Sequence, residues 1–290
     1  MYAIIEEPAR GWSAPVLASL LGGLALTGLF GLWQRRAAQP LIDLRLFANR
    51  LFSWGTAAFA LLSFAMTGVL FILTPYLQSV QGNDAQGTGL RLLPMIGALI
   101  AAAAASQAAA ARLGVRVVIP AGMAVSAAGL VILTQATATS GYGIVALALA
   151  VFGAGLGLGL PLAAEAVLGT LPSHQTGMGN AVSRTVQSIG VALGTAILGS
   201  VLNAAYRGAL AGHLTGLPGA ASGAASASIA GARGVAERLP GGAGPVLARV
   251  AGSAYVHGMV RAEAVGIGVL LVGAVMCLLL LPGKSQERSA

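Results

Sequence analysis

The 290-residue chain has 57% hydrophobic and only 8% charged residues, whereas roughly a quarter of the residues in a soluble domain are charged. So little charge cannot cover a water-facing surface, which excludes a soluble globular fold and indicates surroundings made largely of lipid. The net charge of +8 comes from dispersed basic residues without a basic stripe, which argues against nucleic acid as a partner.

Seven stretches reach the length of about 20 mostly apolar residues that a helix needs to cross a bilayer. They lack the period-two alternation of barrel strands, so we expect helices. The predicted fold class is therefore an all-α integral membrane protein with about seven transmembrane helices. In chain order the stretches cover 14–33, 52–77, 90–111, 116–134, 142–168, 180–203 and 259–282.

The segments between these stretches predict the domain organisation. Residues 1–50 are expected to hold an external N-terminus, one transmembrane helix and a cytoplasmic linker interrupted by Pro40. Residues 51–290 are expected to form a six-helix bundle. Its long external loop at 204–258 is rich in Ala, Gly and Ser, so we expect partial disorder or loose helix there.

The basic residues predict the orientation of the chain. The connections 78–89 and 135–141 contain no Lys or Arg. Basic residues cluster in the alternate connections and after the last helix. The positive-inside rule then places the N-terminus outside and the C-terminus in the cytoplasm of a multi-pass plasma-membrane protein. The residues on the predicted cytoplasmic side are Arg35, Arg36, Arg45, Arg50, Arg112 and Arg116 (which flank a turn at Gly114), Lys284 and Arg288.

Glu165 is the most informative charge in the sequence. It follows Pro161 by one helical turn, in an apolar stretch near the expected cytoplasmic end of its helix. A carboxyl group in such surroundings is a candidate for carrying a proton. A structural ion pair with Arg184, at the start of the next helix, is the alternative that we favour, and the two roles are compatible.

Other polar side chains within the apolar stretches are candidates for ion pairing or for lining a cavity. They include Gln187, one turn after Arg184, and Gln78. Arg91 is expected to cap a helix or anchor it at the interface. Glu263 is expected in the first turn of the last helix, extended toward the interface, and a role toward a cationic substrate is a lesser alternative.

Glycines spaced four residues apart allow close packing of helices in lipid. The run GAGLGLGLP at 153–161 could alternatively provide a flexible joint beside Pro161. It lacks the strand–turn–helix context of a dinucleotide site. The pairs are Gly153 with Gly157, Gly155 with Gly159, and Gly190 with Gly194.

The sequence offers no constellation for catalysis or metal binding. Cys277 is the single cysteine, and no Cys, Asp or Glu stands at metal-ligand spacing from any of the three histidines. We therefore expect no metal, no cofactor and no enzymatic activity.

Several segments, in this order and spacing, resemble the C-terminal half of the fourteen-helix drug/proton antiporter branch of the major facilitator superfamily. The resemblance extends over nearly the whole chain. The segments are IIEEPARGW at 4–12, PLIDLRLFANRLF at 40–52, PYLQSVQG at 75–82, TGLRLLP at 88–94, ARLGVR at 111–116, GAGLGLGLP at 153–161, the stretch 165–206, and AYVHGM at 254–259.

This resemblance implies that the last six helices form the C-terminal bundle of a multidrug efflux permease. The first helix would be the second of two extra helices that join the bundles. The implied activity is export of hydrophobic or cationic compounds in exchange for protons, with Glu165 where the family often has an acidic residue. An N-terminal bundle is expected to be required as a partner, because substrate sits between two bundles. The alternative is a non-transporting fragment or subunit that depends on a separate N-terminal bundle.

Overall fold

The computed structural model describes residues 21–23, 25, 29, 49–169, 176–214, 218–240 and 242–281. Most of the predicted first helix and of the linker after it lies outside these residues. In the described part of the chain six helical spans are long and apolar enough to cross a membrane, which confirms the predicted all-α membrane fold. The elements are α3 (Arg50–Pro75), η2 (Tyr76–Val80), α4 (Ala85–Arg91), α5 (Leu93–Leu113), α6 (Val115–Leu133), α7 (Tyr142–Leu168), α8 (Thr176–Leu210), η4 (Ala211–His213), α9 (Gly219–Ala227), α10 (Ile229–Ala236) and α11 (Ala243–Leu280).

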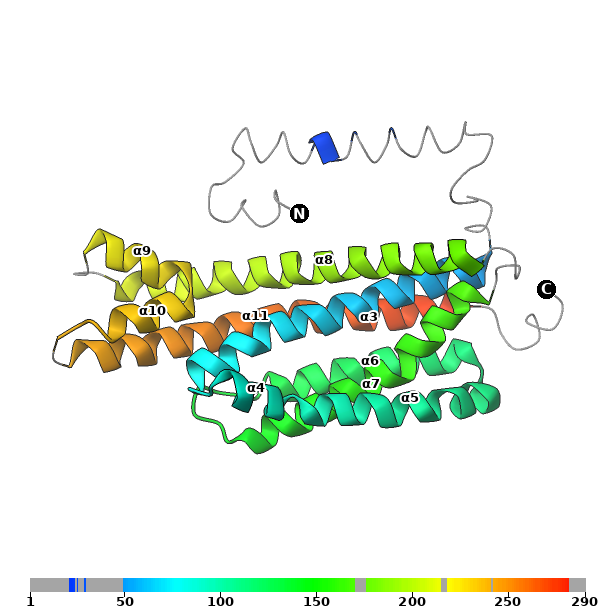
Figure 1. The fold of residues 1–290 in the computed structure, drawn as a ribbon, viewed down its shortest axis with the longest axis horizontal. Coiled ribbons are helices and arrows are strands. Elements are labelled where there is room, and N and C mark those ends of the chain that lie inside the picture. The colour runs from blue at the N-terminus through cyan, green and yellow to red at the C-terminus, as the bar shows by residue number, and fades with distance from the viewer. Residues whose placement is uncertain are drawn as a thin grey trace.

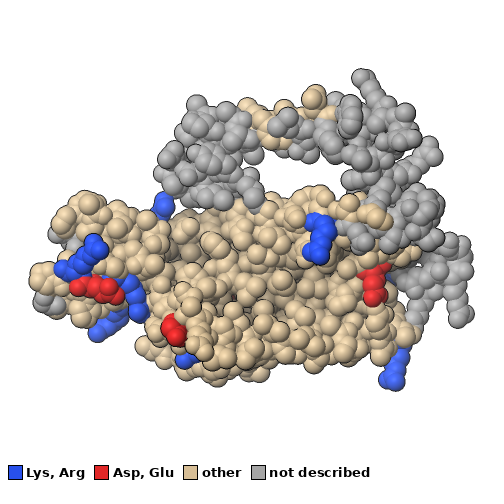
Figure 2. All heavy atoms as spheres, viewed as in Figure 1, with Lys and Arg blue, Asp and Glu red and all other residues tan. Residues whose placement is uncertain are grey.

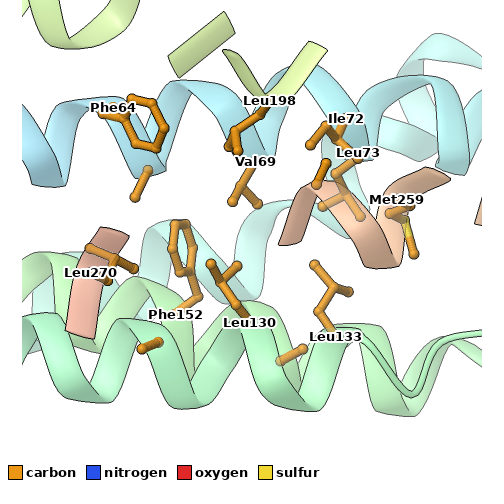
Figure 3. Close-up of a cluster of buried hydrophobic side chains, with 14 of the residues drawn as sticks. Phe64, Val69, Ile72, Leu73, Leu130, Leu133, Phe152, Leu198, Met259 and Leu270 are labelled. Carbon is orange, nitrogen blue, oxygen red and sulfur yellow. The ribbon is translucent and has the colours of Figure 1, made fainter. Parts of the chain in front are cut away.

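The long helices form two groups of three that pack against each other. Helices α8, α3 and α11 run side by side, and α5, α6 and α7 form the second group (Figure 1). The groups meet where α3 packs on α7 and α11 packs on α6. Figure 3 shows the core at this junction, filled by side chains such as Leu73, Leu130, Phe152 and Leu198.

Local sequence signals account for the helix boundaries. The side chain of Asn49 accepts a hydrogen bond from the Leu51 amide at 2.9 Å and so caps α3. Pro75 has no N–H for the helical ladder. Directly after it the helix widens to the π geometry of η2, where the Gln81 amide bonds to the Tyr76 carbonyl at 3.0 Å.

The helices α8 and α11 are longer than the sequence predicted. They contain 35 and 38 residues, or roughly 50 to 57 Å at 1.5 Å per residue, against a hydrocarbon core of about 30 Å. Their extensions, with α9 and α10, account for most of the segment 204–258. The segment for which the sequence predicted partial disorder or loose helix is therefore largely helical in the described residues.

Small residues hold this extension together instead of loosening it. Gly231 lies against the backbone of Ala224, and Gly244 lies against that of Ala236. Around them, Ala225 and Ile229 are buried in the core. The Ala- and Gly-rich composition lets the helices approach closely. A prediction based only on the number of bulky apolar side chains underestimates this packing.

Charge is sparse on the surface of the described bundle. In the view of Figure 2 charged side chains gather at the end that carries α9 and α10, and only isolated basic or acidic side chains interrupt the uncharged surface along the rest of the bundle. This distribution fits a protein whose middle lies in lipid and whose ends meet water.

Candidate functional site

Glu165 lies on the outer face of α7, near the end of that helix. Its neighbours Leu162, Ala163 and Val167 are buried, whereas Glu165 itself is exposed. The Glu165 carboxylate accepts a hydrogen bond from the Gln107 side chain of α5, which is also exposed. A carboxylate–amide pair thus joins two helices on the surface of the bundle.

Arg184 lies on α8 and does not pair with Glu165. Its guanidinium donates to the Gln187 side chain, one turn further along the same helix, at 3.3 Å. Arg184 is exposed and Gln187 is half-buried. The structure therefore gives Glu165 and Arg184 separate amide partners in place of the ion pair that we favoured from the sequence.

Glu263 lies where the sequence did not place it. Because α11 begins at Ala243, Glu263 falls near the middle of the helix and not in its first turn. The side chain is 1% exposed, and neither carboxyl oxygen has a hydrogen-bond partner within the part of the chain that the structure describes. The prediction that it extends to the interface is wrong. The signal that could have revealed it is the helical spacing of Tyr255, Met259, Glu263, Gly266 and Leu270, all of which are buried.

A network of polar side chains ties η2 to α4 and to the loop after α6, at the end of the bundle predicted to be external. The Tyr76 hydroxyl donates to the Thr137 carbonyl at 2.7 Å and accepts from the Gln81 amide at 3.1 Å. The Arg91 guanidinium donates to the Gln81 side-chain oxygen at 2.8 Å. This end of the bundle is therefore joined by side chains from segments distant in sequence.

Arg91 makes two more contacts with the start of α7. Its guanidinium lies 5.1 Å from the centre of the Tyr142 ring, and the Tyr142 hydroxyl donates to the Arg91 carbonyl at 2.9 Å. These contacts hold the junction of α4 and α5 against α7. Gln78, by contrast, is exposed and takes no part in this network.

The network predicts unequal effects for two neighbouring glutamines. Replacing Gln81 with Leu removes hydrogen bonds to Tyr76 and Arg91, so we expect a loss of about 1–3 kcal/mol in the free energy of unfolding. Gln78→Leu is the matched control, and we expect its effect to be less than about 0.5 kcal/mol because the side chain is exposed. Thermal unfolding of the purified protein in detergent measures both. Equal melting temperatures for the two variants would contradict a structural role for the network.

The glycines of α7 face three neighbouring helices in turn. Gly153 and Gly157 lie against carbonyl groups of α5 at Met95 and Leu99. Gly155 and Gly159 lie against α6, and Gly159 also meets Leu62 of α3. On α8, Gly190 and Gly194 lie against the carbonyls of Ala60 and Phe64. Close packing accounts for all of these glycines. Helix α7 continues through Pro161, where a hinge remains a prediction.

The turn between α5 and α6 is built around Gly114, which has φ 86° and ψ 151°. Arg112 lies in the last turn of α5. Arg116, near the start of α6, donates to the Leu278 carbonyl near the end of α11 at 2.8 Å. The turn therefore joins the second group of helices to the first.

The described part of the chain is thus a membrane-type helical bundle with close glycine packing and polar side chains on its outer face. Residues 5–195 match the Major Facilitator Superfamily, and the chain belongs to that family.

Several curated proteins are similar to this chain. The Tetracenomycin C resistance and export protein of Streptomyces glaucescens is 31% identical over 297 residues, covering 100% of this chain and 55% of that protein. The Multidrug resistance protein Stp of Mycobacterium tuberculosis is 31% identical over 195 residues, covering 67% of this chain and 36% of that protein. The Methylenomycin A resistance protein of Bacillus subtilis is 33% identical over 100 residues, covering 34% of this chain and 22% of that protein. The chain thus spans about half or less of the length of these relatives.

Proposed function

We propose that this chain forms the C-terminal six-helix bundle of a proton-coupled exporter of hydrophobic or cationic compounds, in the fourteen-helix branch of its family. Family membership and relatives named for multidrug or antibiotic resistance support this proposal. The observation that carries it is the pair of Glu165 and Gln107 on the outer face of an otherwise apolar bundle.

A carboxylate at this position is costly if it faces lipid. Glu165 and Gln107 satisfy part of each other's hydrogen-bonding capacity, and Arg184 with Gln187 does the same on α8. Their remaining capacity requires water, substrate or a second protein surface. We infer that this face borders a polar cavity between two bundles, as alternating access requires. The second bundle is expected on the same polypeptide or on another.

The predicted orientation fits this role. With the turn at Gly114 in the cytoplasm, the network around Gln81 and the extension formed by α9 and α10 lie outside the cell, and Glu165 lies near the cytoplasmic end of α7. Glu165 would then exchange its proton with the cytoplasm when the cavity opens inward.

The alternative is a membrane subunit that does not transport by itself and docks on a separate N-terminal bundle. The position of α5 favours a docking role. Only 11% of an apolar 18-residue window in the span Ala85–Leu113, which contains α4 and α5, is buried inside the bundle. The exposed face of α5 includes the small residues Ala101, Ala104 and Ala105. Such residues permit close packing against another helix.

Membrane vesicles loaded with a fluorescent cationic dye test the proposal. The full chain is expressed by itself and together with the N-terminal half of the Streptomyces relative, and in at least one of the two cases we expect dye movement that follows an imposed pH gradient. Glu165→Gln should slow this movement at least about tenfold, because the neutral amide cannot carry the proton. Glu237→Gln, at an exposed carboxylate beyond α10, is the matched control and should transport normally.

Two other results would change the conclusion. Dye movement that requires co-expression of the N-terminal half of the Streptomyces relative would favour the docking subunit. Unchanged transport by the Glu165→Gln variant, at equal protein levels, would refute the role of Glu165 in proton coupling.

A further inference from the structure

The carboxyl group of Glu263 is enclosed in the bundle core, away from the outer face that carries Glu165. Its side chain is 1% exposed, and both carboxyl oxygens lack hydrogen-bond partners among the described residues. Most buried carboxyl groups are paired with a cation or with several donors. Glu263 has neither, so its burial requires an explanation.

Helix α11 packs closely on its neighbours both before and after Glu263. On one side of Glu263 in the helix, Gly258 lies against the backbone of Leu202 in α8. On the other side, Gly266 lies next to the Leu130 side chain of α6. Both contacts are close, so α11 is held firmly between its neighbours at this level.

The core around this part of α11 is apolar. Figure 3 shows Met259 of α11 near Leu73 of α3 and Leu133 of α6, and Leu270 of α11 near Phe152 of α7. Met259 and Leu270 flank Glu263 in sequence. Arg261, two residues away, is exposed and turns out of the core. Among the described residues no cationic side chain forms a hydrogen bond with either carboxyl oxygen of Glu263.

Two phenol groups belong to the elements around Glu263: Tyr255 precedes it by about two turns on α11, and Tyr76 lies on η2, which contacts α11. Both hydroxyl protons are already used. Tyr76 donates to the Thr137 carbonyl, and Tyr255 donates to the Ile72 carbonyl at 2.8 Å. Neither phenol is therefore available to solvate a negative charge on Glu263.

An unpaired carboxylate in such surroundings is far more costly than a neutral carboxyl group. We propose that Glu263 is a proton-binding site in the core of the bundle: its side chain is a neutral carboxyl group in this packed conformation, and it exchanges its proton with water only when α11 separates from η2 and α6. The site is distinct from Glu165. Its part in the transport cycle rests on the proposed function.

Tyr76 gives this site a connection to the end of the bundle predicted to be external. Its hydroxyl is bonded to Gln81, and Gln81 is bonded to Arg91. A separation of α11 from η2 would open a path for water beside these polar groups. The proton of Glu263 would then exchange at the end opposite to that of Glu165.

Infrared spectroscopy of the purified full chain in lipid at neutral pH tests the protonation state directly. A neutral carboxyl group has a C=O stretching band that a carboxylate lacks. We expect this band in the unmodified protein and its loss in Glu263→Gln, which preserves size and neutrality. Glu237→Gln should retain the band. Absence of the band from the unmodified protein, or its persistence in Glu263→Gln, would overturn the proposal.

Transport measurements separate this proposal from the proposed function. In the dye-loaded vesicles, a pH gradient should accelerate dye movement at least about tenfold less in Glu263→Gln than in the unmodified protein. Arg261→Gln should retain the full acceleration. A Glu263→Gln variant with unchanged pH dependence would remove Glu263 from the transport cycle. If the unmodified chain moves no dye, by itself or with the N-terminal half of the Streptomyces relative, but shows the infrared band, the proposed function is wrong and the proton site stands.

Discussion

Replacing Gly155 with Ala is expected to destabilise the bundle by about 3 kcal/mol. Gly155 lies where α7 crosses α6, and an added Cβ would lie within 3.0 Å of the backbone nitrogen and hydroxyl of Ser126 and of the Gly122 carbonyl. Two of these three atoms belong to the backbone of α6, which cannot turn away as a side chain can. The helices must therefore separate, and the packing along both is weakened.

The measurement is the fraction of protein that remains monodisperse in detergent after heating. Gly268→Ala is the matched control, because Gly268 lies in the interior of α11 with no atom within 4 Å of an added Cβ. The free energy of unfolding of this control should change by less than about 1 kcal/mol, since alanine only raises the helix propensity at that position. Equal heat sensitivity of the two variants would contradict the close packing of α6 and α7.

Replacing Gly114 with Ala is expected to cost about 1–3 kcal/mol for a different reason. At φ 86° and ψ 151° the backbone occupies a region that is nearly restricted to glycine. The conformation is fixed on both sides, because the Gly114 amide donates to the Ala110 carbonyl at 2.8 Å and α6 begins at the next residue. An alanine must strain this turn or shift α6.

The same heating assay in detergent measures this loss, with Gly97→Ala as control. Gly97 lies in α5, before the turn, and an added Cβ would meet nothing within 4 Å. A shift of α6 should also break the hydrogen bond from Arg116 to Leu278, so α11 should become more accessible to protease at its end. A Gly114→Ala variant as stable as Gly97→Ala would show that the turn does not require glycine.

The transmembrane helices could be predicted from sequence because a spanning helix depends on a local property, the number of consecutive apolar residues. The turn at Gly114 could also be predicted, since a glycine between two basic residues separates two apolar stretches. The extension at 204–258 was predicted less well. Its stability depends on contacts such as the hydrogen bond from Tyr206 to the Ala225 carbonyl at 2.9 Å, and composition does not reveal such contacts.

The candidate site, too, has one residue that local sequence could predict and others that depend on tertiary contacts. Glu165 could be selected from sequence because a carboxyl group in an apolar stretch is rare. Its partner Gln107 is 58 positions away and could not be selected, since the pairing depends on how α5 and α7 are rotated against each other. The burial of Glu263 was missed for a related reason. The start of α11 packs on α10, where Gly244 lies against the backbone of Ala236, and the residues of α11 alone do not reveal this contact.

Hydrophobic length by itself determined that this chain enters a membrane and where the six described spanning helices lie, because the transfer of a segment into lipid depends on the sum of its own residues. Only the tertiary structure decided which carboxyl group faces outward and which is enclosed. That choice depends on the rotation and the ends of each helix, and these are set by close contacts between glycines and the backbones of neighbouring helices.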